Sequence, residues 1–71
     1  MISYDRLWIT MRSRGETTYT LIKNHNVSPG QISRLKRNQG VSTHTINMFC
    51  NILKCDIGDI LEYINIDSKG E

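Results

Sequence analysis

The segment from Ser28 to Asn38 combines residues that start a helix with residues suited to nucleic-acid contact. Ser28 can accept hydrogen bonds from the free N–H groups of a helix start, and Pro29 has the fixed φ of a first helical position. Ile32 and Leu35 are three residues apart, so they share one apolar face. The opposite face presents small polar groups first and cations later. Such a face suits entry into a nucleic-acid groove and contact with its phosphates.

Three residues of this segment can have either a DNA-binding role or an ordinary structural role. Arg34 can donate two hydrogen bonds to the O6/N7 edge of guanine, or it can be an ordinary solvated cation. Gln31 can pair with adenine, but it also stands at capping-box spacing from Ser28. Gly30 costs roughly 1 kcal/mol relative to alanine inside a helix. A close approach of the backbone to DNA and a merely tolerated glycine explain Gly30 equally well.

The rest of the chain is patterned for further helices. Apolar residues recur at helical spacing, and Thr17, Ser42 and Asp56 can each cap a helix start. Gly15 and Gly40 are expected to end the first and the third helix. In chain order the predicted helices cover residues 3–14, 18–24, 29–38, 43–54 and 57–63. The fold class is therefore all-α, a compact five-helix bundle with one domain over residues 1–66 and a flexible C-terminal tail over residues 67–71.

The second and third predicted helices form a helix-turn-helix candidate. They are joined by a link of about three residues, and the second of them carries the exposed basic face. Asn26 in the link is suited to a left-handed backbone turn. The apolar positions that such a unit needs are occupied by Leu21, Ile22, Val27, Ile32 and Leu35, all expected to point inward.

Charge is distributed unevenly along the chain. The net charge is +2, but residues 1–40 carry seven Lys/Arg and two Asp/Glu, whereas residues 41–71 carry two and five. The first part therefore has a net charge of +5 and the second of −3. A basic pole favours a polyanionic partner, and an acidic pole keeps the other side of the molecule away from it.

Several function classes are excluded by what the sequence lacks. No apolar run reaches the length of a membrane span and no signal peptide is present, so a cytoplasmic location is expected. Cys50 and Cys55 lack metal-ligand spacing with the histidines, and both are expected to be small buried side chains. No catalytic triad pattern or phosphate-binding glycine loop occurs. We therefore predict no enzyme activity, no cofactor, no metal and no small-molecule ligand.

Two ordered blocks of sequence resemble a known family. Residues 18–22 and 27–36, followed by residues 41–46 and 49–62, are similar to the Cro/lambda-repressor-like (XRE) helix-turn-helix domain in its small single-domain form. The resemblance extends over residues 4–63. Many members have Gln at the start of the second helix and Gly at the turn, where this chain has Thr18 and Asn26. Many also have a longer polar residue in place of Pro29, which shifts base reading toward Gln31 and Arg34.

The resemblance implies a transcriptional regulator whose helix 29–38 lies in the major groove of double-stranded DNA. Carried over by position, base edges would be contacted by Pro29, Gly30, Ser33 and Arg34. Phosphates or the nearby backbone would be contacted by Thr18, Arg37 and Asn38. Side-chain chemistry adds Gln31 to the base contacts and Ser28 and Lys36 to the phosphate contacts.

Two further expectations concern partners. One domain reads only a few base pairs, so useful specificity needs two copies on a two-fold site. Apolar residues near the C-terminus exceed what one face of a short helix buries, and they either form a homodimer contact or close the core: Ile57, Ile60, Leu61, Tyr63, Ile64 and Ile66. The alternative function is a protein-interaction or antitoxin-like accessory module on the same scaffold, with weak DNA affinity.

Overall fold

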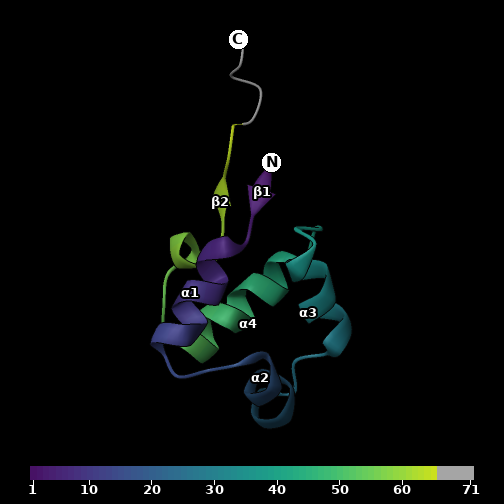
Figure 1. Cartoon of the computed structure of the whole chain (residues 1–71), viewed down its shortest axis with the longest axis vertical. Coiled ribbons are helices and arrows are strands. Elements are labelled where there is room, and N and C mark those ends of the chain that lie inside the picture. The colour runs from purple at the N-terminus through teal and green to yellow at the C-terminus, as the bar shows by residue number, and fades with distance from the viewer. Residues whose placement is uncertain (66–71) are drawn as a thin grey trace.

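The computed structural model describes residues 1–65, and within them the chain is mostly helical. A short ribbon of two strands projects from the helices (Figure 1). The elements in chain order are β1 (Ile2–Ser3), α1 (Asp5–Ser13), α2 (Thr18–His25), α3 (Pro29–Lys36), α4 (Thr43–Leu53), the 3₁₀ turn η1 (Ile57–Asp59) and β2 (Glu62–Tyr63). The predicted tail over residues 67–71 lies outside the described residues.

The helices α2, α3 and α4 begin at hydroxyl side chains. Each cap accepts a hydrogen bond from the backbone N–H three residues further on, with distances of 3.1 Å at Thr17, 3.2 Å at Ser28 and 3.2 Å at Ser42. Such caps satisfy N–H groups that have no partner inside the helix. These three starts were predicted correctly because a cap is a local interaction.

Left-handed residues follow all four helices. They are Gly15 (φ 74°), Asn26 (φ 60°), Asn38 (φ 55°) and Lys54 (φ 54°). The prediction that Gly40 ends the third helix was wrong, because α3 ends at Lys36 and Asn38 makes the left-handed turn. Asparagine tolerates this conformation through local hydrogen bonding of its side chain.

The core is built from the inward faces of all four helices and from the segment after η1. Its buried members are Tyr4, Leu7, Met11, Leu21, Val27, Ile32, Leu35, Ile46, Phe49, Leu53 and Ile60. Ile22 was expected to point inward, but it is 37% exposed, since the buried side of α2 is taken by Leu21 at 0%. Cys50 and Cys55 are half-buried rather than fully buried, and both pack against this core.

The predicted fifth helix over residues 57–63 does not form. Asp59 Oδ2 accepts a hydrogen bond from the Asp56 backbone N–H at 3.1 Å, but helical structure ends after one 3₁₀ turn. The chain then becomes extended, and β2 pairs antiparallel with β1 in the register Ile2↔Tyr63 and Ser3↔Glu62. So short a helix is marginal by itself, and pairing with the distant N-terminal strand gives the backbone another set of partners.

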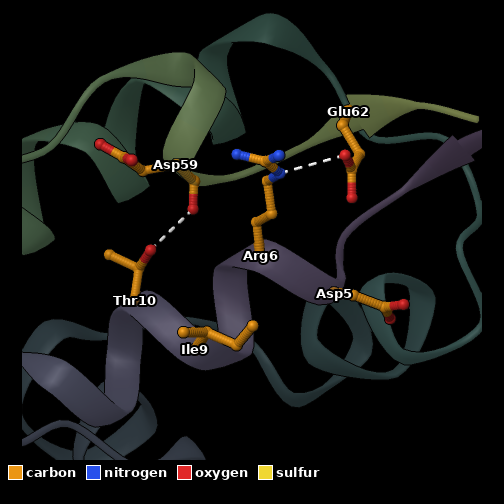
Figure 2. Close-up of a pocket in the computed structure, with 6 residues that line it drawn as sticks. All are labelled: Asp5, Arg6, Ile9, Thr10, Asp59 and Glu62. Carbon is orange, nitrogen blue, oxygen red and sulfur yellow. Dashed lines mark hydrogen bonds and ion pairs between the residues drawn. The ribbon is translucent and has the colours of Figure 1, made fainter.

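Side chains of α1 hold the C-terminal segment in place (Figure 2). Thr10 Oγ1 donates to the Asp59 carbonyl at 2.8 Å, and Arg6 Nε lies 3.1 Å from Glu62 Oε1. The ion pair is largely solvent-exposed and contributes little stability. Its effect is to join the first turn of α1 to the base of the ribbon.

Candidate nucleic-acid interface

The link between α2 and α3 sets the relative position of the two helices. Asn26 ends α2 in the left-handed conformation, and Val27, only 2% exposed, inserts into the core. Ser28 then caps α3 at once, so the turn contains few residues. Ile32 and Leu35 bury the inner side of α3, at 5% and 0% exposure. The opposite side of α3 is left facing solvent.

The residues predicted to contact bases lie in the first part of α3. Pro29, Gly30 and Arg34 are exposed, and Ser33 is half-buried. A Cβ added at Gly30 would meet only Ser28 Oγ, at 3.9 Å. Packing within the protein therefore does not require a glycine at this position.

Gln31 lies at the edge of this face, and its side chain is turned partly inward. Its backbone N–H donates to Ser28 Oγ at 3.2 Å, as capping predicts. Its Oε1 atom is buried and makes no hydrogen bond. A bidentate pair with adenine needs this oxygen as an acceptor. In this conformation Oε1 is not accessible for such a pair.

The cations at the end of α3 differ in their partners from Arg6 and Arg14, near the two ends of α1. Arg34, Lys36 and Arg37 are exposed, and within residues 1–65 none of them forms an ion pair or side-chain hydrogen bond. Arg6 is paired with Glu62, as described above. Arg14 donates from Nε to the Leu53 carbonyl at 2.8 Å and from Nη2 to the Lys54 carbonyl at 3.4 Å, which closes the C-terminus of α4. Arg34, Lys36 and Arg37 therefore form a run of cations at the end of α3 that is available to a polyanion.

Three of the predicted phosphate contacts lie outside the basic run of α3 and have other structural surroundings. Asn38 Oδ1 accepts a hydrogen bond from the Tyr4 backbone N–H at 3.0 Å, and this bond connects the end of α3 to the start of α1. Thr18 is half-buried in the first turn of α2. Ser28 is exposed, although its hydroxyl already serves as the cap of α3.

The outer face of α2 carries a pair that the sequence analysis missed. Lys23 Nζ lies 3.3 Å from Tyr19 OH and 5.6 Å from the centre of the tyrosine ring. Tyr19 is 65% exposed. The spacing of four residues is a signal for such a pair on a helix. It places a further cation and a hydroxyl beside the helix-turn-helix unit.

Glu16 joins both ends of α2. Thr20 Oγ1 donates to Glu16 Oε1 at 2.6 Å, and His25 Nε2 lies 3.4 Å from Glu16 Oε2. The Thr20 hydrogen bond, together with the interaction with His25, lowers the pKa of the Glu16 carboxyl. This cluster stabilises the short helix that must hold α3 in position.

Within the described part of the chain, little indicates metal binding, a reactive thiol or a membrane span. Residues 1–65 contain no group of three or more His, Cys, Asp or Glu side chains that could hold a metal ion. Burial raises the pKa of the Cys55 thiol, which disfavours the reactive thiolate. None of the helices in this range is long and apolar enough to cross a membrane.

Two short helices with this turn, the second exposing unpaired cations, define a helix-turn-helix DNA-binding domain. The comparison with protein families agrees with this class. Residues 6–65 match the model of the Cro/C1-type helix-turn-helix DNA-binding domain, and the chain belongs to this family.

Among solved structures, the crystal structure of the transcriptional regulator VanUg is similar to this chain. The two are 32% identical with a TM-score of 0.80, over 89% of this chain and 84% of that chain. The comparison with curated proteins gives no match.

Proposed function

We propose that this protein is a small transcriptional regulator that binds double-stranded DNA sequence-specifically, with α3 in the major groove. The observation that carries the proposal is the outward face of α3. Its cations have no partner among residues 1–65 and follow exposed small residues, on a helix fixed from behind by Ile32 and Leu35. The family and the similarity to a transcriptional regulator support the same use.

The predicted contact residues form two groups, those that contact base edges and those that contact phosphates. Pro29, Gly30 and Ser33 are small enough to let the helix approach base edges, and Arg34 donates two hydrogen bonds to guanine. Gln31 contacts a base edge at the margin of this face, and its buried Oε1 must turn outward to accept a hydrogen bond there. Phosphates are contacted by Thr18, Ser28, Lys36, Arg37 and Asn38, which set the register of the protein on the duplex.

Selection from a random DNA library tests the proposal. The protein should enrich one sequence, and titration of that sequence at two salt concentrations should show a steep loss of affinity with salt, because bound phosphates release counterions. A scrambled duplex of the same composition is the matched control. If nothing is enriched and binding is weak and salt-labile on every duplex, the regulator function is wrong. The protein-interaction module then becomes the better description.

A single α3 reads few base pairs, and we propose that two copies act together on a two-fold site. The C-terminal residues predicted for this contact differ in their exposure to solvent. Ile60 is fully buried and Leu61 packs against the core, so neither is available for a partner. Ile57, Tyr63 and Ile64 are exposed, and Ile66 lies outside the described residues.

A further inference from the structure

The C-terminal end of α4 brings the two cysteines together. Lys54 follows the helix in the left-handed conformation, with φ 54°, and the Cys55 backbone N–H donates to the Cys50 carbonyl at 3.2 Å. This is the long-range bond of a Schellman helix ending, in which the side chains at the two ends of the bond frequently contact each other. In this chain both of those side chains are thiols. The helix ending therefore sets the spacing of the two thiols.

This spacing suits a disulfide. Covalent bond lengths and one N–H···O=C bond of 3.2 Å hold the Cα atoms of Cys50 and Cys55 roughly 5–7 Å apart. Disulfides join Cα atoms that lie about 4.4–6.8 Å apart. Burial, then the charge of Cys50 and a hydrogen bond with it, raise the pKa of the Cys55 thiol. The two thiols are therefore neighbours in space as well as in backbone bonding.

Solvent can reach this pair of thiols. Both cysteines are free and half-buried, and both line one open hollow on the surface together with Arg14. Cys50 also lines a second hollow, beside His44. A small oxidant in solution therefore has access to the pair without unfolding of the core.

We propose that Cys50 and Cys55 form a reversible oxidation site, at which a low-molecular-weight disulfide converts the two thiols into an intramolecular disulfide that fastens the end of α4. Disulfides in cytosolic proteins, where they occur, are usually transient and either catalytic or redox-sensing. A spacing fixed by the helix ending gives the second thiol a high effective concentration at the first. The inference concerns the stability of the domain and does not depend on DNA binding.

The reaction consists of two thiol–disulfide exchange steps. Cys50 attacks first, because the raised pKa of Cys55 disfavours its thiolate. The Cys50 sulfur bonds to one sulfur of the small disulfide and expels the other as a thiolate. Cys55 Sγ then attacks Cys50 Sγ, which forms the protein disulfide and expels the second small thiolate. The two cysteine protons end on the two small thiols, and two electrons pass from the protein to the oxidant.

The site lies at the end of α4 that is remote from the outer face of α3. Arg14 donates to the Leu53 carbonyl at 2.8 Å, so this end of α4 is joined to the end of α1. The opposite end of α4, at Ser42 and Thr45, shares a hollow with Arg34. The helix has 11 residues and is therefore about 16 Å long. Oxidation should stabilise the domain, because the cross-link restricts the unfolded chain, and should leave the exposed face of α3 in place.

Equilibration with reduced and oxidised glutathione tests the site. The chain has two cysteines, so the intact mass after acid quenching distinguishes the dithiol, the intramolecular disulfide and glutathione adducts. The folded wild-type protein should form the intramolecular disulfide with an equilibrium constant at least about tenfold larger than that of the same chain in concentrated urea. Equal constants in the two states, or glutathione adducts alone, would overturn the proposal.

A matched variant keeps two thiols but separates them. Cys50→Ser combined with Asn47→Cys moves one thiol back by about one turn of α4, out of the helix ending. Asn47 is exposed, so the substitution leaves the core unchanged, and circular dichroism checks that the variant folds. This variant should give mainly glutathione adducts, with an equilibrium constant for the internal disulfide about tenfold below that of wild type. A constant equal to that of wild type would overturn the role of the helix ending.

Thermal unfolding measures the effect of the disulfide on stability. A tenfold preference of the disulfide for the folded state should raise the melting temperature of the oxidised protein by about 6–11 °C over the reduced protein. Reduction with dithiothreitol should restore the lower value. An oxidised protein that melts at the same temperature or lower would overturn the stabilising role. None of these measurements uses DNA, so they decide the oxidation site whether or not the proposed function holds.

Discussion

The outer face of α3 and the β1–β2 ribbon both expose groups that have no partner among the described residues, but the groups differ in kind. On α3 they are the charged ends of Arg34, Lys36 and Arg37, while the helix backbone is closed by its caps. On the ribbon they are backbone groups and apolar side chains. Exposed cations are well solvated in water, whereas exposed apolar surface is not. The first surface therefore suits a polyanion, whereas the second gains stability only when it is removed from water.

The two regions also differ in how firmly they are held. Ile32 and Leu35 anchor α3 in the centre of the core. The base of the ribbon is held by Ser3 and Tyr4, which are buried, but its outer residues have only each other. Substitutions in the two regions should therefore separate stability, DNA affinity and self-association.

The largest effect is expected from Leu35→Ala behind α3. This change removes a fully buried side chain and should lower the free energy of unfolding by about 2–5 kcal/mol. Tyr63→Ala in the ribbon, at 67% exposure, should cost far less, about 0.5 kcal/mol. Urea unfolding followed by circular dichroism measures both. Similar losses would mean that the ribbon belongs to the cooperative core.

Arg34→Ala should weaken binding to the selected DNA by about 1–3 kcal/mol if the guanidinium reads a guanine, and should leave binding to other sequences nearly unchanged. Arg6→Ala is the matched control, since it removes the same charge from the opposite, acidic side of the molecule. Fluorescence anisotropy with the selected and scrambled duplexes measures the difference. An equal loss on both duplexes would remove Arg34 from the base-reading residues.

Arg37→Ala should act on all sequences alike. A cation that contacts a phosphate contributes counterion release, so its loss should reduce the slope of log K against log salt by about 1 and weaken binding uniformly. Lys36→Ala should behave in the same way. A sequence-dependent loss at either position would instead place that side chain at a base edge.

Gly30→Ala should change stability and binding in opposite directions. The added Cβ meets only Ser28 Oγ at 3.9 Å, so the free protein should gain about 0.4–1 kcal/mol from the reduced freedom of the unfolded chain. If the backbone closely approaches DNA at this position, affinity should fall. Thermal unfolding and anisotropy test the two parts, and unchanged affinity would leave Gly30 as a tolerated residue.

The smallest expected effect is on the pH dependence of stability, through the Glu16 carboxyl beside α2. The pKa of Glu16 is lowered in the folded protein, so the stability from its ionised form is present above the ordinary value of 4.5 and is lost as the pH falls through the folded value. Wild-type protein should therefore lose slightly more stability below pH 4.5 than Glu16→Gln does. Urea midpoints at several pH values measure this. Parallel curves would mean that the Thr20 hydrogen bond does not favour the ionised carboxyl.

Helix-capping residues and the turn residue Asn26 predicted the helix-turn-helix unit correctly. Thr17, Ser28 and Ser42 cap the helices they were assigned to, and Asn26 makes the left-handed turn. The same kind of signal failed after Asp56, where an apparent cap precedes only one 3₁₀ turn. A cap lowers the cost of starting a helix, but a short helix persists only when packing along its length stabilises it.

The exposed face of α3 was predicted from the sequence, and the DNA contacts assigned to its residues stay a prediction. That α3 would carry an exposed basic face followed from the spacing of Ile32 and Leu35. The inward turn of Gln31 Oε1, the bond from the Tyr4 backbone to Asn38 and the use of Arg14 at the end of α4 could not be read from spacing. Each depends on residues far apart in the sequence or on the space left by packing.

The sequence by itself determined where α2, α3 and α4 begin and which side of α3 is buried, because these depend on neighbours within a few positions. The first helix was predicted from residue 3, but α1 begins at Asp5 because Ile2–Ser3 pairs as a strand. Only the tertiary structure decided which cations remain unpaired and where the ends of the chain go. Strand pairing joins residues 2–3 to residues 62–63. No short-range pattern encodes that pairing, because its hydrogen bonds exist only once the helices between the strands have folded and brought them together.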